Sequence, residues 1–210
     1  YFHFLTITFF IGNMEKGRIV YYYIDSSKLK IGDIILTRGD SYISKYVRKK
    51  LNSEYSHSSI YVGNSHIIEA IEIVSYTNLY GINFKKKEDI LVLRLEGLNK
   101  EQQEIIKENA LSLYGAEYDR ERAEKSPMRE NEKEKSGNYV GEFCSKLVAK
   151  VFEKSGFRLF ENIRYENTTI VDIENCKILK KVERRISMKF RTNSAFAFLQ
   201  NAKPRQFKIS

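Results

Sequence analysis

Short runs of β-branched and aromatic residues, separated by turn residues, fill most of the first half of the chain. The predicted strands are 19–24, 29–36, 56–62, 65–74 and 90–95. Gly63-Asn64, between the third and fourth runs, is typical of a hairpin turn. Gly32-Asp33 marks a turn ahead of the apolar end of the second run. The first half therefore predicts an antiparallel sheet built around a hairpin.

Helical spacing of apolar residues is found in separate segments between and after these strands. The predicted helices are 41–51, 99–115 and 144–155. Asn99 and Gln102 form a capping box at the start of the second helix, and Gly115 ends it. Further strands are predicted near residues 178–186. Because strands and helices are each grouped along the chain, the pattern predicts an α+β fold and not a doubly wound sheet.

The ends of the chain are set apart from one central domain. The predicted division is an N-terminal segment 1–13, a domain 14–190 and a C-terminal extension 191–210. The apolar run in the first segment is too short to span a bilayer and lacks a basic leader, so it predicts neither a membrane helix nor a signal peptide. It is either a pairing strand or a stretch ahead of a natural start at Met14, and localisation stays open. The charged residues 119–138 predict a surface loop or lid.

Composition and charge narrow the partners only slightly. The chain has 210 residues, 42% of them hydrophobic, and a formal net charge of +9, which favours an anionic surface, polymer or lipid headgroup. A lysine-rich surface that only faces solvent would give the same net positive charge. No zinc-finger or RNA-binding motif is present, so specific nucleic-acid binding is not predicted. The three histidines lack metal-ligand spacing, and neither a metal nor another cofactor is predicted.

The two cysteines have different surroundings. Cys144 stands at the predicted start of a helix, where free backbone N–H groups and the helix dipole stabilise a thiolate and can hold an oxyanion. Its other interpretation is a small buried residue on the apolar stripe of that helix. Cys176 is not at a helix start, and a packing role is predicted for it. Cys144 is therefore the candidate nucleophile.

A thiol at neutral pH needs a nearby base, and His57 is the best candidate. His57 begins a strand among serines that leave its ring approachable, whereas His66 is predicted to be a hairpin surface residue. A three-residue loop in the hairpin would pair Ser59 with Glu69 and place this carboxylate diagonally beside His57. A two-residue turn at Gly63-Asn64 would bring Glu72 there instead. Both registers are physically allowed, and a bulge could exchange them.

Several segments, taken in order, resemble one known family. They are Lys30-Ile31-Gly32-Asp33-Ile34-Ile35-Leu36, Tyr55-Ser56-His57-Ser58-Ser59-Ile60-Tyr61-Val62-Gly63, Ile67-Ile68-Glu69-Ala70, Tyr114-Gly115-Ala116-Glu117-Tyr118-Asp119 and Phe143-Cys144-Ser145-Lys146-Leu147-Val148. The set resembles the circularly permuted NlpC-type papain-like family, the YiiX/YaeF-like group of cysteine peptidases or amidases. The resemblance runs over roughly residues 28–182 and implies a papain-like fold, with His57, Glu69 and Cys144 as the catalytic residues and Glu69 preferred to Glu72.

The resemblance also sets the functional hypotheses. It implies a cysteine hydrolase that forms an acyl-enzyme on an amide- or ester-containing substrate, such as a cell-wall (peptidoglycan) peptide, an N-acyl compound or a lipid. The alternatives are a lipid acyltransferase or phospholipase at membranes and a catalytically silent binding module. Phe143 and Lys146 depart from the residues common at these positions, which bears on the substrate more than on the thiol chemistry. Tyr118 and Asp119 are expected to have structural or pocket-lining roles.

Overall fold

A computed structural model describes residues 13–15, 18–71, 73–116, 140–182 and 186–191. Several predictions lie outside these ranges. They concern the apolar run before Asn13 with His3, the acid Glu72, the charged stretch 119–138 with Tyr118 and Asp119, and the C-terminal extension from residue 192 onward.

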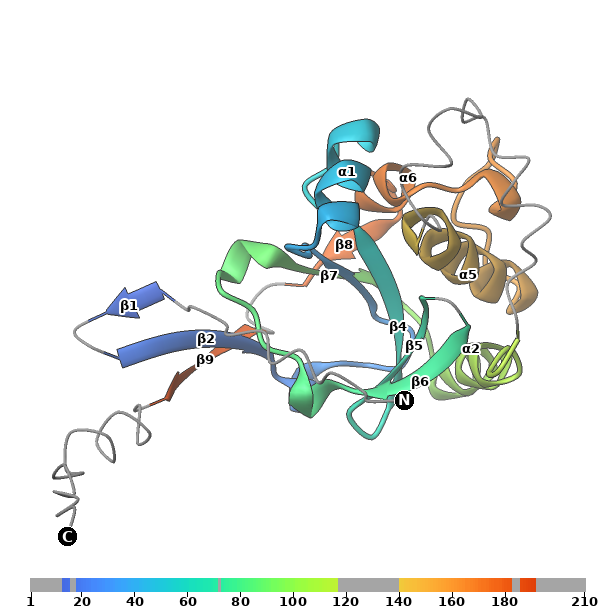
Figure 1. The fold of residues 1–210 in the computed structure, drawn as a ribbon. Helices are drawn as coiled ribbons and strands as arrows, with labels where there is room; N and C mark the ends of the chain where they lie inside the picture. Colours follow the sequence, from blue (N-terminus) through green and yellow to red (C-terminus); the bar gives the residue numbers. More distant parts are fainter. Residues whose placement is uncertain (1–12, 16–17, 72, 117–139, 183–185, 192–210) are drawn as a thin grey trace, which may run out of the picture.

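The centre of the fold is a six-stranded antiparallel sheet (Figure 1). Its strand order is β6-β5-β4-β3-β7-β8. The strands are β3 (Ile34–Thr37), β4 (His57–Gly63), β5 (His66–Ala70), β6 (Val74–Asn78), β7 (Ile90–Leu95) and β8 (Leu179–Lys181). The predicted strands 56–62 and 90–95 are thereby confirmed, whereas the run 65–74 is divided between β5 and β6. The α+β class is also confirmed.

A second, smaller sheet has the order β1-β2-β9. Its strands are β1 (Asn13–Glu15), β2 (Arg18–Ile24) and β9 (Ile186–Arg191). β2 continues toward the main sheet through an isolated bridge between Tyr22 and Phe84. The small sheet therefore joins residues near the two ends of the described chain.

The three predicted helices are found in the predicted order, with two differences in bounds. The second helix ends at Leu111 and not at Gly115, and the third begins before its predicted start. The helices are α1 (Tyr42–Leu51), α2 (Lys100–Leu111), α5 (Val140–Lys154) and α6 (Ile170–Glu174), with short 3-10 helices η1 (Ser26–Lys28), η2 (Leu79–Gly81), η3 (Lys87–Asp89) and η4 (Tyr165–Asn167). Ser41 caps α1, and the capping box of Asn99 and Gln102 starts α2 as predicted. α5 begins at Val140, four residues before the predicted start at Cys144. Among the described residues, no helix has the length and apolar character needed to cross a bilayer.

The two faces of the main sheet are packed differently. α5 and α2 lie along one face (Figure 1), and the larger core lies between them and the sheet. Ile34, Leu36 and Ile60 point into this core, whereas Ile35 and Tyr61, their neighbours in the chain, belong to a smaller cluster on the other face. This alternation is the period of a strand. Because both faces are covered, residues 58–62 of β4 are all buried.

Candidate active site

His57 and Glu69 meet where β4 and β5 lie side by side. His57 is the first residue of β4 and pairs with Thr37 of β3. One pleat further, Ser59 pairs with Glu69, so the acid lies diagonally across from the histidine. His57 Nε2 and Glu69 Oε2 are 2.7 Å apart, and the side chains are 18% and 8% exposed. With Nε2 held by the carboxylate, Nδ1 is the ring nitrogen left for the thiol.

The hairpin reaches this register by a route different from the predicted one. Asn64 and Ser65 have φ angles of 50° and 60° and form a two-residue turn between Gly63 and His66, so neither the three-residue loop nor the turn at Gly63-Asn64 is found. The register then shifts between Tyr61 and Gly63, which restores the pairing of Ser59 with Glu69. The pairing itself is one of the two predicted registers, and it is confirmed.

Cys144 lies on the face of α5 that packs against β4. Its side chain is 0% exposed and belongs to the larger core. Burial acts to raise the pKa of the thiol, but the charge of His57 and hydrogen bonds from His57 and Ser58 outweigh it, so the pKa of Cys144 is lowered. A buried cysteine held only by packing would show the opposite shift. The groups that lower the pKa of this thiol thus belong to His57 and Ser58 of β4.

The position of Cys144 within α5 corrects the expected source of thiolate stabilisation. Because α5 begins at Val140, Cys144 lies in the second helical turn, and its N–H pairs with the carbonyl of Val140 in the helical pattern. That N–H is not one of the free donors at a helix start. The described helix thus gives no support to the prediction that the N–H of Cys144 holds an oxyanion, and the contacts that lower the pKa come from β4.

The interaction of His57 with Cys144 raises the pKa of His57, whereas it lowers the pKa of Cys144. Burial disfavours its charged form, but Cys144 and Glu69 together raise the pKa of His57 from 6.5 to about 10. The pKa of Glu69 is lowered, since bonds from His57 and Thr77 to the carboxylate outweigh the effect of its burial. Each of the three side chains thus stabilises the charged form of its neighbour in the series Glu69, His57 and Cys144.

Two residues of this site were missed in the sequence. Ser58 is fully buried, its hydroxyl has no hydrogen-bond partner among the described residues, and its backbone N–H and hydroxyl both act to lower the pKa of Cys144. The pairing of β4 with β5 stops at Ser59, next to this N–H. Thr77 of β6 bonds to Glu69, and only the register of β5 with β6 shows that the two are close. Ser58 directly follows His57 in the sequence, but it was interpreted only as a small neighbour that leaves the imidazole ring approachable.

The remaining candidates have structural surroundings. Cys176 is buried in the larger core, its sulfur donates to the carbonyl of Leu159 at 3.3 Å, and burial raises its pKa. His66 stacks on Tyr76 at the hairpin, with ring centroids 4.3 Å apart. In the described ranges, no group of three His, Cys, Asp or Glu side chains is placed to hold a metal ion.

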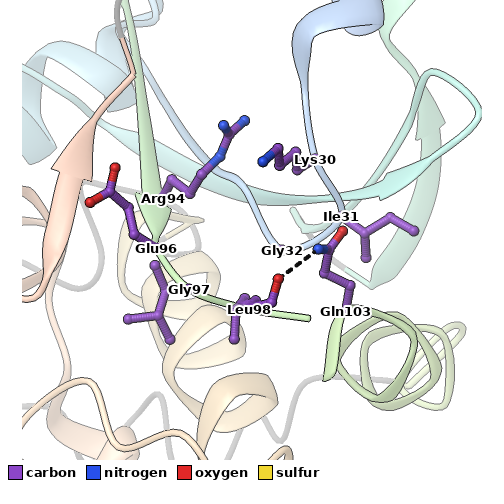
Figure 2. A pocket seen from close by; sticks show the side chains of 9 residues that line it. Lys30, Ile31, Gly32, Arg94, Glu96, Gly97, Leu98 and Gln103 are labelled. Atoms are coloured by element: carbon purple, nitrogen blue, oxygen red, sulfur yellow. Dashed lines mark hydrogen bonds between the residues drawn. The ribbon is translucent and has the colours of Figure 1, made fainter. Parts of the chain in front are cut away.

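A polar pocket of about 190 Å³ lies at the opposite end of the sheet (Figure 2). Arg94 and Lys30 point into it, and Gln103 closes one side by donating to the carbonyl of Leu98 at 3.0 Å. Arg94 is held by two bonds of 2.6 Å to the fully buried Asp33, so its charge is already balanced. The lining contains no Cys, Ser, Thr or His, and none of the candidate catalytic residues belongs to it.

Comparison with known proteins agrees with the predicted family and fold. A search of curated proteins finds no match. Among solved structures, the chain is similar to the crystal structure of metalloprotein yiiX from Escherichia coli O157:H7, with 24% identity and a TM-score of 0.54. The likeness covers 73% of this chain and 96% of that one, and at this identity it shows the fold alone. Residues 28–177 match the family described as permuted papain-like amidase enzyme, YaeF/YiiX, C92 family. The chain therefore belongs to the permuted papain-like amidases of the YaeF/YiiX group.

Proposed function

We propose that this member of an amidase family is a cysteine hydrolase in which Cys144 is the nucleophile, His57 the base and Glu69 the orienting acid. The observation that carries the proposal is the bond of 2.7 Å between His57 and the buried carboxylate of Glu69, on the strand against which α5 packs with the buried Cys144. The lowered pKa of the thiol agrees with this geometry. This is the arrangement that makes a thiol nucleophilic at neutral pH.

The proposed reaction has two halves. The proton of Cys144 resides on His57, and the thiolate attacks the carbonyl carbon of an amide or ester, forming an S–C bond and an oxyanion. His57 then gives its proton to the leaving nitrogen or oxygen as that bond breaks, which leaves an acyl-enzyme. In the second half, water attacks the acyl carbon, His57 takes its proton, and the S–C bond breaks. Glu69 holds the ring in one orientation throughout and balances its charge.

The substrates favoured by this proposal are cell-wall peptides and N-acyl compounds. They share an amide carbonyl that the thiolate can attack. The bonds formed by Glu69 and Thr77 leave the imidazole positioned without substrate, so a small acyl compound is expected to acylate the thiol. A lipid ester would react through the same steps and is tested alongside.

The test is turnover and intact mass of the full chain with a panel of peptide amides, N-acyl amino acids and lipid esters. Cys144→Ala should abolish both turnover and the acyl adduct, and His57→Ala should lower the rate by about a hundredfold or more. Cys176→Ala is the matched control, since it removes the other buried thiol and should retain activity. Addition of a chelator should leave the rate unchanged.

Hydrolysis of every substrate by Cys144→Ala at the wild-type rate would refute the proposal. The binding-module alternative is distinguished by alkylation with iodoacetamide. If Cys144 reacts only near its ordinary pKa of 9.0, it is not activated and the chain is a silent relative.

A further inference from the structure

Helix α1 stands next to the end of the sheet that holds His57 (Figure 1). β3 ends at Thr37, the partner of His57, and the chain then leads through Gly39 into α1. The Gly39 N–H donates to Ser56 Oγ at 3.1 Å, which holds this connection against the residue before His57. α1 also contacts α5, the helix that carries Cys144. α1 is thus next to the proposed catalytic centre, with its exposed side turned to solvent.

That exposed side is basic and aromatic. α1 contains four basic residues and no acidic residue. Lys45 and Lys49 are one turn apart and exposed, with Tyr42, which is 74% exposed, on the same side. Neither lysine forms an ion pair within the part of the chain that the structure describes. We call these three residues the α1 face.

The arrangement of charges on the α1 face is unfavourable for the isolated helix. Like charges one turn apart repel each other. The helix dipole accounts for basic residues in the last turn, which include Lys49, but not for Lys45 in the first half of the helix. An anionic partner would compensate for both.

A second basic segment lies beside the α1 face. Lys85 Nζ is 2.7 Å from Asp40 Oδ2, which brings the Lys85-Lys86-Lys87 run to the start of α1. The bond from Lys85 lowers the pKa of Asp40 against the effect of burial, and the charges of Lys45 and Arg48 add to the lowering. One carboxylate is therefore shared by several cations, and Lys86 and Lys87 remain exposed next to it.

We propose that the α1 face docks on an anionic lipid surface and brings the neighbouring catalytic centre to acyl substrates held there. The role in delivering substrate rests on the proposed function, whereas the docking itself does not. Lysines that flank an exposed tyrosine on a helix suit the membrane interface, where the ring enters the headgroup region and the ammonium groups meet anionic lipids. A soluble polyanion would use the lysines but not the ring.

The experiment measures co-sedimentation of the full chain, as the Cys144→Ala variant, with two kinds of vesicle. One is phosphatidylcholine alone, and the other contains phosphatidylglycerol in addition. Binding is expected only to the second and should weaken with salt. Lys45→Gln with Lys49→Gln should reduce the partition coefficient by about 25-fold, since each basic residue near such a surface contributes about fivefold. Tyr42→Ser should reduce it further.

The matched control is Lys100→Gln with Lys154→Gln, which removes the same charge from the exposed ends of α2 and α5. It should leave binding within about twofold. Equal losses in both double variants would overturn the docking face, as would binding that is the same to both kinds of vesicle. Binding to soluble polyglutamate that is unaffected by Tyr42→Ser, with no binding to vesicles, would overturn the membrane in favour of a polymer.

Failure of the docking and failure of the proposed function are distinguishable. Vesicle binding is measured without turnover, and thermal melts of each variant show that α1 is folded. Conversely, the wild type and the Lys45→Gln, Lys49→Gln variant should hydrolyse a soluble amide at the same rate. A chain that hydrolyses soluble substrates but does not bind vesicles contradicts only the docking.

Discussion

Replacing Ser58 by alanine should raise the pKa of Cys144 without harming the fold. The hydroxyl of Ser58 is fully buried, has no hydrogen-bond partner among the described residues, and can therefore turn its proton toward the Cys144 thiolate, whose pKa it acts to lower. A hydrogen bond to a charged group contributes about 1.5–3 kcal/mol. Since one pKa unit corresponds to about 1.4 kcal/mol, loss of the hydroxyl should raise the pKa of the thiol by about one to two units. The backbone N–H of Ser58 and the charge of His57 remain in the variant.

The assay is the rate of iodoacetamide alkylation at Cys144, followed by intact mass across a pH series. The pH at which the rate is half-maximal should move upward in Ser58→Ala, while the circular dichroism spectrum should match that of the wild type because only one hydroxyl group is removed from β4. Ser145→Ala is the matched control. Ser145 is also fully buried, but its hydroxyl donates to the carbonyl of Thr168 at 2.7 Å. This variant should lose stability and keep the alkylation profile.

An alkylation profile of Ser58→Ala that coincides with the wild type would refute this reasoning. The side chain of Ser58 would then only fill space between β4 and α5 and would not affect the pKa of Cys144. A shift of equal size in Ser145→Ala would also contradict it, because the effect would then follow from a general loosening around Cys144.

Three further predictions test other parts of the structure. Thr77→Val removes the hydroxyl that bonds to Glu69 and should slow turnover about fivefold with little change in KM, whereas Thr77→Ser should restore the rate. Arg94→Met leaves the buried carboxylate of Asp33 unpaired and should lower the free energy of unfolding by about 3–5 kcal/mol in urea titrations, with the alkylation profile of Cys144 unchanged. Because the pKa of His57 is raised from 6.5 to about 10, its protonation contributes stability that is complete below pH 6.5 and is lost as the pH rises through about 10. Thermal melts across this range should show the loss, and Glu69→Gln should shift it to lower pH because one of the raising interactions is gone.

Local patterns predicted most of the elements and the pairing of the hairpin. The capping box of Asn99 and Gln102 and the strand 90–95 are found as expected, because both depend on neighbours in the chain. The pairing of Ser59 with Glu69 was one of two allowed registers. The choice between them could not be derived from the turn residues, since the bulge near Val62 adds the residue that the shorter turn removes.

What could not be predicted depends on contacts between distant segments. β2 pairs with β9, whose residues lie more than 150 positions later in the chain. No local sequence pattern predicts a pairing between segments this far apart. The early start of α5 was missed because Val140-Gly141-Glu142-Phe143 contains no strong capping residue. Thr77 lies eight residues after Glu69, and only the folded register brings its hydroxyl to the carboxylate.

The second-turn position of Cys144 has a consequence for the evolution of such a fold. Where a helix terminus activates a thiol, the activating groups belong to the main chain and survive almost any substitution. Here the lowered pKa of the sulfur depends largely on the side chains of His57 and Ser58, with Glu69 behind the ring. One substitution at any of these positions is therefore expected to remove the activation of the thiol and to leave the fold intact. A protein with this fold can thus evolve from an enzyme into a binding protein in few mutational steps.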